Sequence, residues 1–327
     1  MLAAGFGTRM RPLTNDLPKP LMPVWNVPAI EHTLAMLRRW GVRDVLVNLH
    51  HRADRLFDHL RARPADGLRI ALSFEPEILG TGGALRKAEW FLAGGPCWVT
   101  NADVVCDLDP GPLLRAYRPG RTVAVMWMQE ARGPRTVEMS RGRITNFRSQ
   151  RPGTPGTYTF TGLQLLDPAL LRHDRPYLPV EPAFGSSINA YERAMADGWT
   201  VAGVCVPRSY WADVGTPQQY LTCHRELLEA KRKGLPGARL MTATRGKRGG
   251  ASGFAAVSPL ASVHADAVIR DAVVWEGAVV EAGARLEQAV IGRDTRVRGT
   301  VRGVAMTAAA ALEPAERDAL SALGWKP

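Results

Sequence analysis

The residues best suited to chemistry stand at the start of the chain. An apolar segment over residues 2–4 runs directly into two glycines, Gly5 and Gly7, and Thr8 and Arg9 follow. Glycine carries no Cβ, so a loop rich in glycine brings backbone N–H groups close to an anion. The pattern predicts a loop that holds phosphate groups.

A lysine follows this loop in the tripeptide Pro18-Lys19-Pro20. Each proline ring fixes its own φ and restricts the preceding residue, so the tripeptide is expected to be extended. Lys19 is thereby predicted to hold a second positive charge beside the phosphates. A glycine loop alone is a common strand-to-helix turn, and the added lysine makes the phosphate interpretation more specific.

The string over residues 5–21, GFGTRMRPLTNDLPKPL, resembles the sugar-1-phosphate nucleotidyltransferases, the NDP-sugar pyrophosphorylases that include mannose-1-phosphate guanylyltransferases. The resemblance implies that a sugar 1-phosphate oxygen attacks the α-phosphorus of an NTP and that pyrophosphate leaves. It makes Arg9 and Lys19 the catalytic cations. Arg9 would hold the leaving phosphates, and Lys19 the α-phosphate and the attacking phosphate.

The same resemblance implies that two aspartates bind Mg²⁺. Asp103 ends an apolar strand-like run in an Asn-Ala-Asp context, where the family usually has Asn-Gly-Asp. Asp213 belongs to the family signature W-x-D-[IV]-G-T-P, here over residues 211–217, in which Trp211 either stacks on a substrate or fixes the acid. Mg²⁺ keeps several waters and is typically held by one or two carboxylates plus substrate phosphates. The resemblance, not the spacing, implies that the two acids converge.

A second glycine-rich loop, over residues 75–85, is expected to contact the nucleobase, although a capped helix start also explains it. Glu75 stands where thymidylyl enzymes of the family tend to carry Gln. A carboxylate offers two acceptors for the adjacent N1–H and N2–H₂ donors of guanine, which favours GTP. Uridylyltransferases acting on N-acetylmuramate 1-phosphate also carry glutamate near this place. The predicted nucleotide-binding residues are Leu2, Ala3, Ala4, Gly5, Gly7, Thr8, Arg9, Glu75, Gly80, Thr81 and Gly82.

The sugar is expected at residues 159–163, which resemble the F-[ST]-G strand of the family's hexose pocket, with Gly162 admitting the sugar ring. Many relatives carry an E-K-P segment before this strand, but residues 147–152 of this chain contain no Glu-Lys pair. Either Arg148 or Arg151 is expected to bind the phosphate, or the substrate differs. The predicted sugar-phosphate-binding residues are Asn101, Gly162, Arg148 and Glu181.

Three functions stay open at this point. The first is guanylyl transfer from GTP to mannose 1-phosphate. The second is the same chemistry with UTP or dTTP on another sugar phosphate, such as N-acetylmuramate 1-phosphate or glucose 1-phosphate. The third is a regulatory subunit that binds nucleotide sugars without turnover. The chain retains the predicted phosphate-binding and metal-binding side chains, which argues against this function; they are Arg9, Lys19, Asp103 and Asp213.

Alternating strand-like and helical patterns must position these side chains. Apolar residues recur at helical spacing over residues 31–40, and strands are predicted over 42–49, 68–74, 97–100, 122–128, 158–166 and 200–206. The alternation predicts α/β architecture: a Rossmann-like three-layer α/β/α domain with a mainly parallel sheet. Ligands of such sheets bind at the carboxyl ends of the strands, where the first glycine loop lies.

The C-terminal part shows a period of six residues after a predicted helix over 218–233. Val268, Val274, Val280 and Leu286 form one series, and Arg285 interrupts a second. This period predicts a β-helix of about two coils, left-handed as in the family, which is expected to lean on the catalytic domain or to support a homo-oligomer. The predicted domains are a nucleotidyltransferase domain over 1–234, a linker over 235–256, the β-helix over 257–303 and a tail over 304–327 with a helix over 313–323.

The composition excludes several classes of function. The 327 residues carry a net charge of +11, which suits nucleotides or nucleic acid, but the densest basic run, residues 245–248, has no interleaved aromatics, so nucleic acid is not expected. No run reaches the ~18 apolar residues of a membrane span, and the four cysteines lack metal-binding spacing, so a cytoplasmic protein is expected. Because the first strand is short, the natural start is expected upstream of Met1.

Overall fold

The computed structural model describes residues 1–174, 176–241 and 253–308. These form two compact units: the first comprises Met1–Gly5 and Thr33–Asp213, and the second comprises Phe6–His32 and the chain from Val214 onward. These units divide the chain differently from the predicted boundary at residue 234, because residues 6–32 and the helix before residue 234 group with the C-terminal part. The predicted helix over 313–323 and most of the predicted linker lie outside the described residues. Within the described residues, no helix is long and apolar enough to cross a membrane.

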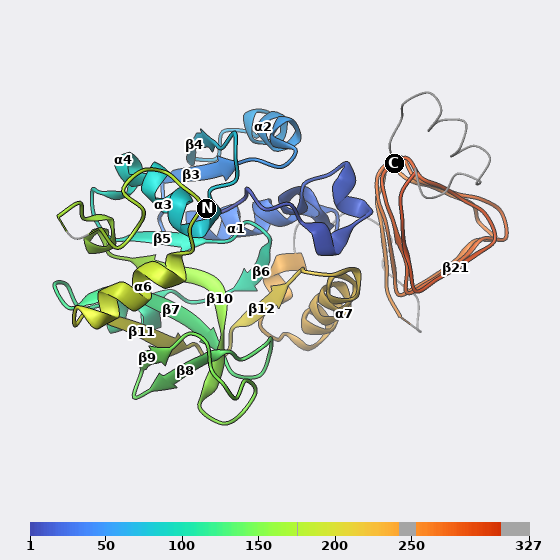
Figure 1. Ribbon diagram of the computed structural model, residues 1–327. Coiled ribbons are helices and arrows are strands. Elements are labelled where there is room, and N and C mark those ends of the chain that lie inside the picture. The colour runs from blue at the N-terminus through green and yellow to red at the C-terminus, as the bar shows by residue number, and fades with distance from the viewer. Residues whose placement is uncertain (175, 242–252, 309–327) are drawn as a thin grey trace. The chain divides into compact units, whose positions relative to one another are not determined.

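The first unit is built on a mixed sheet (Figure 1). Its six strands lie in the order β5-β10-β7-β11-β9-β8. Where the sequence predicted a mainly parallel sheet, β7 and β11 are parallel, but β10 runs antiparallel to both of its neighbours. β3 and β4 form a separate parallel pair, and β6 and β12 an antiparallel one. The strands are β3 (Asp44–Leu49), β4 (Arg69–Phe74), β5 (Cys97–Thr100), β6 (Val104–Asp107), β7 (Thr122–Gln129), β8 (Val137–Ser140), β9 (Arg143–Asn146), β10 (Thr157–Leu166), β11 (Thr200–Cys205) and β12 (Tyr210–Asp213).

Helices cover both faces of this sheet, which confirms the α/β class. Alternate residues of β7 enter different cores: Met126 packs in the core that includes Tyr191 of α6, and Trp127 in the core that includes Leu113 of α5. Because successive side chains of a strand point to opposite faces, an almost wholly apolar strand such as β7 requires cover on both sides. The helices are α1 (Ala29–Arg39), α2 (Ala53–Arg61), α3 (Gly80–Lys87), α4 (Glu89–Leu92), α5 (Gly111–Ala116) and α6 (Ser187–Ala196).

The second unit contains the hairpin of β1 (Pro23–Val24) and β2 (Val27–Pro28), the helix α7 (Pro217–Lys233) and a β-helix. The α7 helix begins at Pro217, with the Thr216 hydroxyl accepting from the backbone N–H of Gln219 (3.2 Å). It ends at Gly234, whose φ of +65° suits a residue without Cβ. The helix predicted over 218–233 is thus confirmed.

The β-helix extends the predicted one at both ends. Its short strands form three parallel sheets around a triangular coil (Figure 1), in the orders β13-β16-β19-β22, β14-β17-β20 and β15-β18-β21. The predicted positions Val274, Val280 and Leu286 are buried, but Val268 is 47% exposed and Ile269 packs inward instead. The strands are β13 (Ala255–Val257), β14 (Ser262–Val263), β15 (Val268–Arg270), β16 (Ala272–Val274), β17 (Val279–Val280), β18 (Arg285–Glu287), β19 (Val290–Ile291), β20 (Arg296–Val297), β21 (Thr300–Arg302) and β22 (Ala305–Met306).

A buried aromatic cluster joins the three parts of the second unit. The backbone N–H of Trp25 donates to Nε2 of His224 (3.1 Å), and the Trp25 indole N–H donates to the His224 carbonyl oxygen (3.0 Å). Trp275 of the β-helix donates its indole N–H to the Tyr220 hydroxyl oxygen (3.1 Å), and the Phe254 ring stacks on His224. These contacts explain why residues 6–32 belong with α7 and the β-helix.

This cluster predicts a loss of stability in mild acid. Burial lowers the pKa of His224 from 6.5 to about 4, because the cluster excludes water and Nε2 accepts the Trp25 N–H. The unfolded chain therefore takes up a proton first as the pH falls. We expect the free energy of unfolding to be highest above pH 6.5 with respect to this group. It should fall by about 3 kcal/mol as the pH is lowered from 6.5 towards 4.

Urea unfolding of the full chain at a series of pH values measures this loss. His224→Gln is expected to flatten the curve between pH 4 and 6.5, because Gln does not ionise. His264→Gln is the matched control, since His264 is an exposed histidine of the same unit and its replacement should leave the slope unchanged. Equal slopes for the wild type and His224→Gln would contradict the prediction.

Candidate active site

The structure brings the two predicted metal-binding aspartates together. β6 and β12 pair with Asp213 opposite Val104, and Asp103 directly precedes Val104. Both acids therefore stand at one end of the same two-stranded ladder, and both are partly exposed. Two aspartates at one strand end offer the oxygen ligands that Mg²⁺, a hard cation, prefers. Among the described residues, no group of three or more His, Cys, Asp or Glu gathers as a metal site, so other ligands would have to complete the coordination.

Gly162 supports Asn101, and its predicted contact with a sugar ring stays a prediction. It has a φ of +83° and lies where the β10–β7 register shifts. A Cβ at this position would stand 2.6 Å from Nδ2 of Asn101. The Gly162 carbonyl oxygen also accepts from the Asn101 backbone N–H (3.1 Å). The glycine therefore fixes the segment that leads to Asp103.

Trp211 fixes the segment of the second aspartate. Its indole N–H donates to the carbonyl oxygen of Thr161 (3.0 Å), which directly precedes Gly162. The side chain is buried in β12, two residues before Asp213. Of the two roles that the sequence left open for Trp211, the structure favours the one that orients the acid.

The first loop starts beside these acids, still in the first unit. The Leu2 backbone N–H donates to the Thr100 carbonyl oxygen (2.8 Å), and the Ala102 N–H donates to the Leu2 carbonyl oxygen (2.9 Å). The Ala3 N–H donates to Oδ1 of Asn48 in β3 (2.6 Å). Residues 2–5 are thus held between the carboxyl ends of β3 and β5, where α/β sheets bind ligands.

The rest of the loop belongs to the second unit, where Lys19 packs against Gly7. Gly7 has a φ of +64°, and a Cβ there would stand 3.5 Å from the Lys19 Cβ and 3.0 Å from Cγ2 of Thr14. The Thr14 hydroxyl donates to the Gly7 carbonyl oxygen (2.9 Å). This arrangement confirms that the lysine lies beside the glycine loop.

The two predicted catalytic cations differ in exposure. Lys19 is 8% exposed, whereas Arg9 is exposed in a short 3-10 helix with Thr8. Pro18 is extended as predicted, but residues 19–21 form a 3-10 turn, so the expectation of a fully extended tripeptide is wrong. The turn buries the lysine stem, which restricts the position of its ammonium group.

Glu75 does not face a base-binding surface, which corrects the prediction that it reads guanine. The residue is 0% exposed. Its Oε1 accepts from Nδ2 of Asn48 (2.8 Å), and its Oε2 accepts from the Leu79 backbone N–H (3.0 Å). Both oxygens that the sequence interpretation assigned to guanine are thus already bound inside the protein.

The glycines of the second loop are required by a neighbouring backbone. A Cβ at Gly80 would stand 2.6 Å from the Gly185 carbonyl oxygen, and one at Gly83 would overlap the Ala183 carbonyl oxygen. The Gly82 N–H donates to the same Gly185 oxygen (2.7 Å), and the Ser187 N–H donates to the Thr81 hydroxyl (2.9 Å). Close packing therefore explains Gly80 and Gly82, while Thr81 remains exposed.

This packing predicts that Gly83→Ala destabilises the first unit. The new methyl group would push residues 183–187 away from α3, and overpacking of this kind costs about 1–3 kcal/mol. Urea unfolding should show the loss. Gly94→Ala is the matched control, because a Cβ at Gly94 meets nothing within 4 Å. A Gly83→Ala protein as stable as the control would disprove the close approach.

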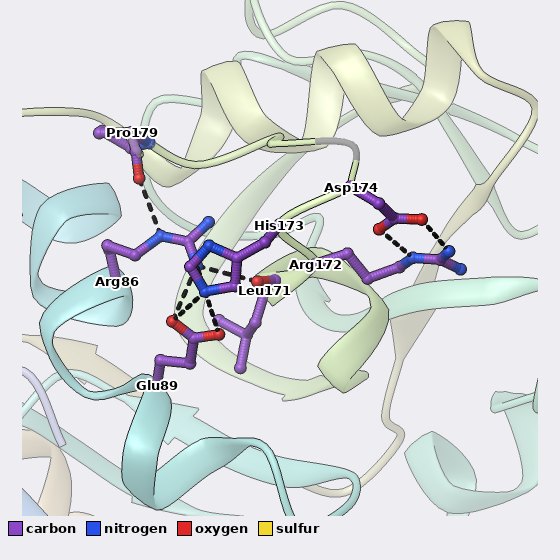
Figure 2. A network of polar contacts seen from close by, with 7 residues as sticks. All are labelled: Arg86, Glu89, Leu171, Arg172, His173, Asp174 and Pro179. Carbon is purple, nitrogen blue, oxygen red and sulfur yellow. Dashed lines mark hydrogen bonds and ion pairs between the residues drawn. The ribbon is translucent and has the colours of Figure 1, made fainter. Parts of the chain in front are cut away.

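Arg86, near the C-terminal end of α3, binds Leu171 and Pro179, which precede residues 183–187 in the chain (Figure 2). Its Nε donates to the Pro179 carbonyl oxygen (2.8 Å), and its Nη1 donates to the Leu171 carbonyl oxygen (2.9 Å) and to Glu89 (2.9 Å). Arg86 is buried, so these partners compensate its desolvated charge. Residues 179–187, which include the predicted residue Glu181, therefore contact both ends of α3. Glu181 itself is exposed.

Arg148 has partners for its charge on α6, and its predicted role in binding the sugar phosphate stays a prediction. Its guanidinium forms an ion pair with Glu192, and Nη2 donates to Oδ1 of Asn189 (2.9 Å), both on α6. Both side chains of this ion pair are exposed, so it is a surface contact of small energetic weight. Arg151 lies exposed in the following loop.

Sequence reasoning missed Asn48 and Thr14. Asn48 is the one amide in the apolar run of β3, and a polar side chain in a buried strand must find hydrogen-bond partners. That rule was the available signal. Thr14 lies inside the recognised N-terminal string, but its bond to Gly7 is a loop-closing contact that no spacing rule reveals.

Comparisons with known proteins identify the family of the chain. Residues 1–230 match the model of the nucleotidyl transferase family. The chain is 31% identical to Probable mannose-1-phosphate guanylyltransferase 1 of Oryza sativa subsp. japonica, over 91% of this chain and 82% of the relative. It is 35% identical to N-acetylmuramate alpha-1-phosphate uridylyltransferase of Caulobacter vibrioides, over 70% of this chain and 96% of the relative.

The fold has a counterpart among solved structures. The crystal structure of HddC from Yersinia pseudotuberculosis superposes with a TM-score of 0.56 at 20% identity, over 69% of this chain and 97% of that one. Identity this low supports the fold alone. Taken with the family match and the paired aspartates, the chain belongs to the nucleotidyl transferase family, as a sugar-1-phosphate nucleotidyltransferase.

Proposed function

We propose that this protein transfers the guanylyl group of GTP to mannose 1-phosphate, giving GDP-mannose and pyrophosphate. The pairing that sets Asp213 beside Asp103 carries the chemical part of the proposal. The choice of substrates follows relatives named as mannose-1-phosphate guanylyltransferases, which match 91% of the chain, with the β-helix region included. The uridylyltransferase relative matches only 70%.

In the proposed reaction, an oxygen of the sugar phosphate attacks the α-phosphorus in line, a P–O bond to it forms, and the bond to pyrophosphate breaks. The attacking phosphate is already an anion, so no base is needed to create it. The protein contributes position and charge neutralisation. Backbone N–H groups of Gly5, Gly7 and Thr8, with Arg9, would hold the leaving phosphates, and Lys19 would hold the α-phosphate.

Asp103 and Asp213 would hold Mg²⁺. When bound, the cation supplies Lewis-acid stabilisation of the phosphate oxygens. Trp211 and Asn101 orient the two carboxylate segments through their bonds to Thr161 and Gly162. Chelation of divalent cations is expected to abolish pyrophosphate release, and added Mg²⁺ to restore it. A cytoplasmic location and self-association through the β-helix belong to this proposal, the latter to be checked by analytical ultracentrifugation.

The second candidate is uridylyl transfer to N-acetylmuramate 1-phosphate, because the relative with that name is 35% identical. An assay of pyrophosphate release with Mg²⁺ separates the two candidate functions. It combines each of GTP, UTP, dTTP, CTP and ATP with each of the 1-phosphates of mannose, glucose, N-acetylglucosamine and N-acetylmuramate. Turnover confined to GTP and mannose 1-phosphate supports the first candidate. Turnover with UTP keeps the proposed mechanism but replaces the proposed substrates. No turnover with any combination favours a regulatory subunit.

A further inference from the structure

We infer that Glu75 and Asn48 form a buried relay that positions the first glycine loop for the nucleotide. This inference rests on the proposed role of residues 3–5 in binding an NTP. The relay is defined by three hydrogen bonds in the first unit: Leu79 N–H to Glu75, Asn48 Nδ2 to Glu75, and Ala3 N–H to Asn48. Glu75 is a positioning residue in this role.

The relay has one donor and acceptor assignment that is consistent with all three hydrogen bonds. The Ala3 N–H can only donate, so the Asn48 oxygen must face it, and the Asn48 NH₂ must then face Glu75. The Leu79 N–H also only donates, so Glu75 must accept on both of its oxygens. A carboxyl group offers an acceptor oxygen on each side, which the amide of Gln does not.

The surroundings keep the relay rigid. Glu75 is 0% exposed and Asn48 is 7% exposed, so water does not compete for these bonds. The Glu75 backbone is held by its N–H to the Leu49 carbonyl oxygen (2.8 Å) and by Nδ1 of His50 at its carbonyl oxygen (2.8 Å). A buried and fully bonded network of this kind transmits a displacement rather than absorbing it.

The relay links three parts of the candidate site. Leu79 lies in the second glycine-rich loop, directly before Gly80. Ala3 leads into the first loop, and the carbonyl oxygen of Leu2 accepts from Ala102, which adjoins Asp103. A change at Glu75 should therefore shift the backbone N–H groups that meet the phosphates. Because phosphates are common to all nucleotides, affinity for every NTP should weaken by the same factor. A glutamate that read the base would instead alter the ratio between GTP and UTP.

An inverted pair provides the test. Glu75→Gln leaves one acceptor for two donors, and Asn48→Asp sets two carboxylates against each other without a donor. In the double variant Asn48→Asp/Glu75→Gln, Leu79 N–H donates to the new amide oxygen at position 75. The new NH₂ group there donates to the new carboxylate at position 48, and that carboxylate accepts from Ala3. All three bonds return with the charge unchanged. Glu77→Gln, at an exposed position two residues away, is the matched control.

We expect each single variant to raise the KM of the NTP about tenfold, with the KM of the sugar phosphate within about twofold. The double variant should return to within about threefold of the wild type, and Glu77→Gln should not differ from it. Independent, multiplying effects in the double variant would overturn the relay. A changed GTP to UTP ratio in Glu75→Gln, or an equal rise in the KM of the sugar phosphate, would overturn the positioning role.

Urea unfolding of the wild type, the two single variants and the double variant keeps the relay testable if a single variant is unstable. Stability recovered in the double variant supports the three bonds, and additive losses contradict them. Wild-type protein that turns over no NTP and sugar phosphate would defeat the proposed function, whereas the unfolding cycle would still decide the relay. The two failures are therefore distinguishable.

Discussion

Replacing Asp103 with asparagine is expected to lower the turnover number about a thousandfold, which corresponds to about 4 kcal/mol of lost transition-state stabilisation. Asn keeps the size of the side chain but removes the negative charge that a divalent cation requires. Asp213→Asn should have an effect of similar size, because Asp213 stands beside Asp103 on the β6–β12 ladder. Steady-state release of pyrophosphate under saturating substrates measures both.

The fold should survive both changes, since both acids are partly exposed at the end of their strands. Asp109→Asn is the matched control. Asp109 is exposed beyond β6, and its Oδ1 accepts from the Gly111 N–H (3.0 Å), a bond that Asn can keep. We expect the control to retain full turnover. Near-normal turnover in Asp103→Asn, with wild-type thermal stability, would remove Asp103 from the metal site.

Lys19→Met is expected to reduce kcat/KM by about two to three orders of magnitude, or about 3–4 kcal/mol. Met preserves the apolar stem that packs against Gly7 but carries no charge for the α-phosphate. The lysine is 8% exposed, so its ammonium group is restricted in position before substrate arrives. An electrostatic contact organised in advance contributes more to the transition state than a mobile one.

Lys233→Met supplies the comparison for this variant. Lys233 lies in the last turn of α7, and its exposed ammonium group pairs with Glu229 (2.5 Å), a surface contact of small energetic weight. Full activity is expected there. Kinetics of Lys19→Met that match those of Lys233→Met would exclude the lysine from the mechanism, and a loss of folded protein would point to packing as its role.

The sequence anticipated much of this molecule because its signals are local. A glycine loop next to an apolar strand and a helical pattern over residues 218–233 each act within a short stretch of chain, and each led to the observed element. The six-residue period likewise located the β-helix. Its one misassigned position, Val268, lies in a strand where the neighbouring Ile269 packs inward.

The predictions that failed concern partners distant in the chain. Glu75 offers two acceptors, and the sequence interpretation assigned them to guanine, but β3 presents Asn48 to one of these oxygens. Arg148 has the charge to bind a phosphate, and α6 presents Glu192 to it, a neighbour that the sequence did not indicate. Residue type defines what a side chain can bind, whereas the tertiary fold decides which partner reaches it first.

By itself, the sequence determined the family, the α/β class, the β-helix and the four charged residues of the proposed chemistry, because each is written in types and spacings along the chain. Only the tertiary structure decided that Asp103 and Asp213 adjoin, that Gly162 makes room for Asn101, and that residues 6–32 pack with α7 and the β-helix. Strand pairing and burial join residues far apart in the chain, and no local pattern encodes that choice.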